Sequence, residues 1–210
     1  MKELKFIAIE GVIGAGKTTL AKAMAERLHA GVILEEFEEN PFLAKFYSNP
    51  GQYAFHTQIY FLLSRYRQQG QIAQTDLFAS RIITDYLFAK DRIFAEVNLR
   101  EDEFALYDRI YGLVEKDVPK PDLVIYLQVS SEVLYKRIKQ RNRLIERDVN
   151  FDYIDALVNA YNAFFIHYNT APLLIVAAEG FDFVGDSRDL DLIVDAIART
   201  RTPRMVLSKS

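Results

Sequence analysis

One short segment near the start of the chain constrains its fold more than any other. Residues 11–18 read Gly-Val-Ile-Gly-Ala-Gly-Lys-Thr and match the pattern G-x-x-x-x-G-K-[ST] in full. The apolar run Phe6–Ile9 precedes this segment, and residues 19–28 follow it with helical spacing. A buried strand, a glycine-rich turn and a helix, in this order, are the context that the pattern requires. The sequence therefore predicts a phosphate-binding loop (P-loop) and a nucleotide site.

Each type of residue in this loop has a chemical role in binding phosphate. Glycines let backbone N–H groups converge on phosphate oxygens, because no Cβ obstructs the approach. The helix that begins near Lys17 directs the positive end of its dipole at the same anion. Lys17 would bridge the β- and γ-phosphates, and the Thr18 hydroxyl would ligate Mg²⁺. We therefore expect ATP and Mg²⁺ as cofactors. The residues expected to hold the nucleotide are Gly11, Gly14, Ala15, Gly16, Lys17, Thr18 and Thr19.

Apolar runs elsewhere predict the rest of a sheet. Further strands are expected at residues 32–34, 81–85, 123–127 and 173–176, which makes five with the first. Helical spacing recurs between them, over residues 41–69, 101–116, from 131 onward, 151–168 and 189–199. This alternation predicts an α/β fold of the P-loop kinase type, with a five-stranded parallel sheet and helices on both faces. We expect a single domain over residues 1–210 and a frayed tail from Thr202.

Composition limits the classes of function. The net charge is −3, which argues against nucleic acid as a partner, because such binding rests on a basic surface. No apolar run approaches the ~18 residues that span a bilayer, so no membrane partner is expected. The chain has no cysteine, which excludes disulfides, thiolate metal sites and cysteine catalysis. A cytoplasmic protein that acts on a small molecule fits these observations.

Carboxylates follow two of the predicted strands. Glu35 comes after the second strand and Asp85 ends the third. Ligands of an open parallel sheet bind beyond the carboxyl ends of its strands. One carboxylate there can take a proton from an acceptor hydroxyl, and another, Asp85, can help Thr18 to anchor Mg²⁺. The alternatives are a solvated acidic loop over residues 35–39 and a turn residue at position 85.

A basic segment predicts a lid over residues 137–150. Arg137 and Arg141 are four residues apart and share a helix face, Arg143 follows, and Glu146 lies just beyond. Guanidinium groups suit phosphate binding through paired N–H donors. A basic flap would also exclude water, which competes with the acceptor hydroxyl. The alternative is an exposed charged helix.

These segments together resemble the deoxynucleoside kinases that act on deoxyadenosine, deoxyguanosine and deoxycytidine. The resemblance spans roughly residues 4–180, in the same order. It implies that Glu35 is the general base and that the lid arginines Arg137, Arg141 and Arg143 are catalytic. It also implies a nucleoside site. The residues that the resemblance assigns to the nucleoside are Glu35, Tyr47 and Glu146 at the sugar and Gln58, Arg65, Asp91 and Phe94 at the base.

The expected reaction is ATP-dependent phosphorylation of a deoxynucleoside at its 5′-hydroxyl. The Arg65–Asp91 pair favours a purine, deoxyadenosine or deoxyguanosine, with deoxycytidine possible. The resemblance also implies a homodimer. Residues 179–182 are a candidate for the loop over the donor base.

The chain departs from the family pattern at four positions. Tyr86 stands where the family has a phosphate-binding arginine, so Arg92 or the lid arginines are expected to compensate. Glu36 replaces a proline, Asn142 replaces the glycine of the lid, and Ile145 replaces one of two acidic residues.

Two other functions compete with this interpretation. A thymidylate kinase has a similar P-loop strand, but it needs a site for an anionic nucleotide, and residues 35–39 are acidic. A nucleotide-binding regulatory module without kinase activity is the second alternative. Guanine-specific modules usually carry an Asn-Lys-x-Asp segment, which the sequence lacks.

Overall fold

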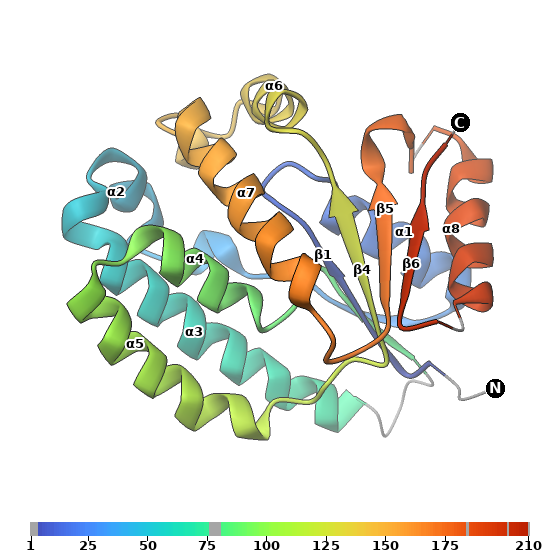
Figure 1. The fold of residues 1–210 in the computed structure, drawn as a ribbon, viewed down its shortest axis with the longest axis horizontal. Coiled ribbons are helices and arrows are strands. Elements are labelled where there is room, and N and C mark those ends of the chain that lie inside the picture. The colour runs from blue at the N-terminus through green and yellow to red at the C-terminus, as the bar shows by residue number, and fades with distance from the viewer. Residues whose placement is uncertain (1–3, 76–80, 184, 201, 210) are drawn as a thin grey trace.

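The computed structural model describes residues 4–75, 81–183, 185–200 and 202–209. Its centre is a sheet in the order β2-β3-β1-β4-β5-β6, in which every neighbouring pair is parallel (Figure 1). The strands are β1 (Phe6–Glu10), β2 (Gly31–Ile33), β3 (Ile82–Thr84), β4 (Leu123–Gln128), β5 (Leu173–Ala177) and β6 (Arg204–Leu207). The expected α/β fold with a parallel sheet is confirmed.

Helices cover both faces of the sheet. In Figure 1, α1 and α8 lie on one side of the sheet, and α3, α4, α5 and α7 lie on the other. The α-helices of the described chain are α1 (Lys17–Leu28), α2 (Leu43–Ser48), α3 (Pro50–Thr75), α4 (Lys90–Asn98), α5 (Glu101–Val114), α6 (Ser131–Arg141), α7 (Phe151–His167) and α8 (Ser187–Arg199). Short 3₁₀ turns are η1 (Phe37–Glu39), η2 (Glu115–Asp117), η3 (Leu144–Glu146) and η4 (Ala178–Gly180). None of the described helices has the length and apolar character that a membrane span requires.

The central strands explain why the site forms where it does. All five residues of β1 are buried, as is expected of a parallel strand covered on both faces. In the sheet register Ala8 is opposite both Thr84 and Val124. The carboxyl ends of β1 and β3 therefore meet at one edge. The P-loop follows β1 there, and Asp85 follows β3.

The sixth strand corrects the expectation of five strands and a frayed tail. β6 pairs in parallel with β5, and Met205 and Leu207 pack against the core. The Arg204 guanidinium donates to the carbonyl oxygen of Phe165 at 2.8 Å. The strand has only three apolar residues and lies at the sheet edge, so the local sequence carries little signal. Its stability comes from pairing with β5.

Candidate active site

The P-loop has the geometry of an anion cradle. Gly14 and Gly16 have φ angles of 88° and 100°, a region that residues with a Cβ rarely adopt. Helix α1 begins directly after Gly16, without a side-chain cap, so its first N–H groups stay available to a ligand. The Lys17 ammonium donates to the carbonyl oxygens of Gly11 at 2.8 Å and Val12 at 3.3 Å. The Lys17 side chain therefore lies over the P-loop, where it would also contact a bound phosphate.

Asp85 joins the P-loop to Glu35. Its Oδ2 accepts a hydrogen bond from the Thr18 hydroxyl at 2.5 Å, and its Oδ1 accepts one from the Glu35 backbone N–H at 2.8 Å. The described residues contain no group of three or more His, Cys, Asp or Glu side chains that could enclose a metal. The pair of Thr18 and Asp85 oxygens nevertheless fits Mg²⁺, which takes few protein ligands and completes its shell with phosphate and water oxygens.

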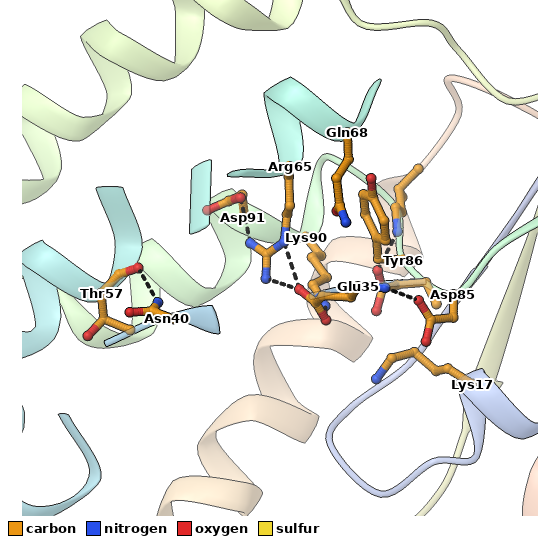
Figure 2. A network of polar contacts seen from close by, with 12 residues as sticks. Lys17, Glu35, Asn40, Thr57, Arg65, Gln68, Asp85, Tyr86, Lys90 and Asp91 are labelled. Atoms are coloured by element: carbon orange, nitrogen blue, oxygen red, sulfur yellow. Dashed lines mark hydrogen bonds and ion pairs between the residues drawn. The ribbon is translucent and has the colours of Figure 1, made fainter. Parts of the chain in front are cut away.

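Glu35 lies between two buried cations (Figure 2). Its Oε1 accepts from the Arg65 Nε at 2.8 Å and from the same guanidinium's NH2, and its Oε2 accepts from the Lys90 Nζ at 2.6 Å. Burial raises the pKa of Glu35, but Arg65 and Lys90 together outweigh burial, so its pKa falls far below the usual range. The Glu35 side chain is 13% exposed, compared with 41% for Glu36. Glu35 is therefore not part of a solvated acidic loop.

The predicted Arg65–Asp91 pair is present, with NH1 and Oδ2 2.5 Å apart. Asp91 is fully buried, and its Oδ1 also accepts from the Tyr107 hydroxyl at 3.1 Å. Asp91 does not line the cavity that contains Glu35. Asp91 contacts Arg65 outside the cavity lining, so the Arg65 guanidinium is the member of the pair that faces the cavity.

A single cavity collects most of the residues singled out in the sequence. Its polar lining consists of Lys17, Thr18, Glu35, Tyr47, Thr57, Gln58, Arg65, Asp85, Lys90, Arg141, Arg143 and Glu146. Its apolar lining includes Phe37, Leu43, Phe46, Phe61, Phe94 and Tyr153. The P-loop lysine and the α3 residues thus face one space.

Aromatic rings and one amide also line the cavity. Gln58 is 2% exposed, and its Oε1 has no hydrogen-bond partner among the described residues. The Lys90 ammonium lies 5.8 Å from the centre of the Phe94 ring. Tyr47 packs against Tyr153 with ring centres 6.3 Å apart. The pKa of Tyr47 is raised by burial first, then by Tyr153 and the nearby carboxylates, which include Glu146.

The three arginines of the lid segment do not all line the cavity. Arg141 donates to both carboxylate oxygens of Glu146, through NH2 at 2.5 and 2.6 Å, and Arg143 lies over the Phe37 ring at 5.0 Å. Arg137 is not in the cavity lining. Hydrogen bonds from Ser130 and then the charge of Arg137 lower the pKa of Glu179.

Asn142 explains how the lid tolerates the loss of its usual glycine. It ends α6 with a φ of 47°, in the left-handed region. Asn adopts this region more readily than other residues with a Cβ. The departure at this position therefore keeps the local backbone turn.

Of the residues expected to compensate for Tyr86, the lid arginines Arg141 and Arg143 line the cavity and Arg92 does not. Tyr86 is fully buried, and its hydroxyl accepts from Gln69 Nε2 at 3.0 Å. Arg92 is half exposed and pairs with Asp108 at 3.1 Å, outside the cavity lining. Besides Arg65, the cation in contact with Glu35 is Lys90, which is 3% exposed. Sequence reasoning missed Lys90 because it did not predict helix α4, which begins at this residue.

Glu10 is a second polar residue that sequence reasoning missed. It is fully buried at the end of β1 and accepts from the N–H groups of Gly11 at 2.8 Å and Leu87 at 2.7 Å. The Tyr161 hydroxyl donates to it at 3.2 Å. Burial raises the pKa of Glu10. A glutamate that ends an otherwise apolar strand was the available signal. Glu10 fixes the turn after β3 to the start of the P-loop.

The fold and this site define a P-loop protein whose phosphate loop opens onto an acceptor cavity for a small molecule. The family model for deoxynucleoside kinases matches residues 7–201. The chain therefore belongs to the deoxynucleoside kinase family and is a deoxynucleoside kinase, a nucleotide-binding enzyme that uses a phosphate donor. The expected family and reaction class are confirmed.

Named relatives match three quarters or more of the chain. A deoxyguanosine kinase of Bacillus subtilis is 35% identical over 198 residues, which is 92% of this chain and 96% of that protein. A deoxyadenosine kinase of Dictyostelium discoideum is 41% identical over 162 residues, which is 75% of this chain and 65% of that protein. The solved structure of the M. mycoides deoxyadenosine kinase with its product dCMP and a dCDP is similar with a TM-score of 0.81 at 30% identity, over 92% of this chain and 99% of that chain.

Proposed function

We propose that this enzyme transfers the γ-phosphoryl group of ATP to the 5′-hydroxyl of a purine deoxynucleoside. One observation carries the proposal: a single cavity is lined by Lys17 of the P-loop, by Glu35 and by Gln58 of α3. Figure 2 shows Lys17 and Thr57 on opposite sides of Glu35. A nucleoside that placed its 5′-hydroxyl at Glu35 would therefore extend its base toward the Thr57–Gln58 end of the cavity.

The environment of Glu35 holds an ionised carboxylate in a fixed orientation. It is ionised at neutral pH because Arg65 and Lys90 hold its carboxylate. Oε2 accepts one hydrogen bond and Oε1 accepts two, so Oε2 is the atom with more capacity to take the hydroxyl proton. The two cations fix the orientation of the carboxylate before the substrate arrives. Positioning and preorganised charge supply most of the catalysis in phosphoryl transfer.

The donor side belongs to the P-loop and the lid. We assign ATP to the loop residues 11–19, and Mg²⁺ to the oxygens of Thr18 and Asp85, which adjoin at 2.5 Å. A bound Mg²⁺ would neutralise charge on the donor phosphates. Lys17, Arg141 and Arg143 face the cavity and would bind phosphate oxygens. Arg137 would instead act beside the donor nucleotide, near the 179–182 loop.

The polar groups of the acceptor site support a purine. Arg65 has five N–H donors, of which Nε, NH1 and NH2 each give at least one to Glu35 or Asp91. The remaining N–H groups of Arg65 and the Gln58 amide together offer the base several hydrogen-bond donors and one acceptor. Arginine suits the O6 and N7 acceptors of guanine, and an amide suits the N6 and N7 of adenine. Phe94 would pack on the base.

The sugar would lie between Tyr47 and Glu146. Both side chains line the cavity, and α2, which carries Tyr47, packs against η3, which carries Glu146. We propose that they bind the 3′-hydroxyl and leave no room for a 2′-hydroxyl. Arg141, which pairs with Glu146, would couple closure of the lid to the presence of the sugar.

A homodimer is the assembly that the surface supports. The exposed face of α3 and α5 carries Leu63 at 51%, Leu106 at 51% and Leu113 at 71% exposure. Leu106 and Leu113 are seven residues apart and therefore share one helix face. A second copy of this chain would cover such an apolar stripe through the same surface on both protomers.

A coupled ADP-release assay with ATP and Mg²⁺ tests the proposed reaction. The panel contains the four deoxynucleosides, adenosine and thymidine monophosphate. We expect turnover on deoxyadenosine or deoxyguanosine, little on adenosine, and little on the monophosphate. Turnover on thymidine monophosphate alone would mean that the acceptor is a nucleotide and not a nucleoside. Deoxycytidine is the closest competitor, because the M. mycoides deoxyadenosine kinase has been solved with dCTP as well as with dATP.

A further inference from the structure

Thr57 carries a buried hydroxyl that the reaction described so far does not use. The residue is fully buried in α3, lines the acceptor cavity, and its Oγ1 has no hydrogen-bond partner among the described residues. Thr84 is equally buried, and its hydroxyl donates to the Tyr86 carbonyl oxygen at 2.7 Å. The protein thus satisfies one buried threonine and leaves the other without a partner, at the wall of its ligand site.

An unsatisfied buried hydroxyl is costly, so its retention needs a reason. The backbone of Thr57 is held firmly, because Asn40 Nδ2 donates to the Thr57 carbonyl oxygen at 3.2 Å (Figure 2). The next residue, Gln58, also has a buried oxygen without a partner. Two successive side chains therefore present unmet hydrogen-bonding capacity to the same cavity. A polar ligand there would satisfy both.

The position of Thr57 points to the nucleobase rather than to the sugar or the phosphates. Thr57 is eight residues before Arg65 in α3, which is about 12 Å along a helix axis. Figure 2 places it on the side of Glu35 away from Lys17. The group of the substrate that lies farthest from the transferred phosphate is the base.

We propose that the Thr57 hydroxyl is a specificity-determining contact, which donates a hydrogen bond to a ring nitrogen of the purine that the Gln58 amide does not bind. The inference rests on the proposed function and adds a residue to it. Hydroxyls donate as well as accept, so Thr57 complements an acceptor nitrogen. The contact adds a third polar group to the base site, beyond those of Gln58 and Arg65.

Thr57→Val tests the contact, because valine keeps the shape of threonine and removes only the hydroxyl. We expect kcat/KM for the preferred deoxynucleoside to fall about tenfold, as for loss of one hydrogen bond. We expect the Tm of the unliganded protein to rise or stay unchanged. Thr57→Ser keeps the hydroxyl and should retain most of the activity. Thr84→Val, which breaks a hydrogen bond that is made, should lower the Tm and serves as the stability control.

Substrate analogues locate the partner atom. The 1-deaza, 3-deaza and 7-deaza analogues of the preferred purine each replace one ring nitrogen by C–H. One analogue should lose about tenfold in kcat/KM with the wild type and lose nothing further with Thr57→Val. Equal kinetics of Thr57→Val and wild type on every substrate would overturn the inference while leaving the proposed function standing. Absence of any nucleoside turnover by the wild type would overturn both.

Discussion

The Lys90 ammonium lies 2.6 Å from the Glu35 carboxylate, and the side chains are 4% and 13% exposed. The two residues come from different elements, since Lys90 begins α4 and Glu35 follows β2. Arg65 contacts the other oxygen of the same carboxylate. Glu35 is thus clamped by a cation at each carboxylate oxygen, which fixes the orientation of its side chain. The kinetic and pH predictions for Glu35 and Lys90 depend on this clamp.

Glu35→Gln should lower kcat by about 10²-fold or more, because it removes the group that takes the hydroxyl proton. The KM for the nucleoside should change much less. Glu36→Gln is the matched control, because Glu36 is an exposed neighbour that pairs with the exposed Arg67 at 3.5 Å. Steady-state kinetics of both variants check the prediction. Equal turnover by Glu35→Gln and wild type would remove Glu35 from the mechanism.

Lys90→Met should lower kcat and also reduce stability. Removal of one member of a buried ion pair typically costs about 3 kcal/mol or more, because the remaining charge loses its partner. Lys90→Arg should recover part of both losses. Arg92→Gln, in the same helix but outside the cavity, should leave kcat near the wild-type value. If Lys90→Met matched Arg92→Gln in kcat, Lys90 would have a structural role only.

The charge on Glu35 should also appear in the pH dependence of stability. Its pKa in the folded protein is lowered, so the ion pairs contribute stability above the unfolded pKa of about 4.5, and this contribution is lost as pH falls below it. At pH 7 the wild type should be more stable than Glu35→Gln. The difference in free energy of unfolding should shrink below pH 4.5, by up to ~1.4 kcal/mol per pH unit. A difference that is constant from pH 7 to pH 3 would contradict a paired, ionised Glu35.

Leu113→Glu should convert a dimer into a monomer, because it places a charge in the apolar stripe of α5. Light scattering after size-exclusion chromatography measures the mass directly. Leu192→Glu is the control, since Leu192 is also exposed, at 44%, but lies on α8 across the sheet. A wild-type protein that is monomeric at micromolar concentration would contradict the assembly itself.

Sequence reasoning succeeded where chemistry is carried by neighbours in the chain. The P-loop is contiguous, and Glu35 and Asp85 follow strands whose carboxyl ends must meet in a parallel sheet. The local order of residues therefore sufficed to bring Thr18, Asp85 and Glu35 together. The predicted pairing of Arg65 with Asp91 came from the family resemblance, and the structure contains that ion pair.

The remaining features depend on contacts between distant segments. Lysine is usually an exposed residue, and Lys90 is buried beside Glu35 only because α4 packs against α3. Thr57 has no sequence signal, because an unsatisfied hydroxyl is recognised only when its surroundings are known. Asp91 was expected to face the base, yet Tyr107 of α5 and Arg65 hold it behind the cavity wall. β6 is so short that its apolar pattern does not predict a strand.

Identification of the product tests the proposed reaction most directly. The enzyme is incubated with ATP, Mg²⁺ and an equimolar mixture of the four deoxynucleosides, and the nucleotides formed are separated and identified by mass. We predict that a purine deoxynucleoside 5′-monophosphate, dAMP or dGMP, forms first and dominates. Dominance of dCMP or dTMP would contradict the purine assignment that rests on Gln58 and Arg65.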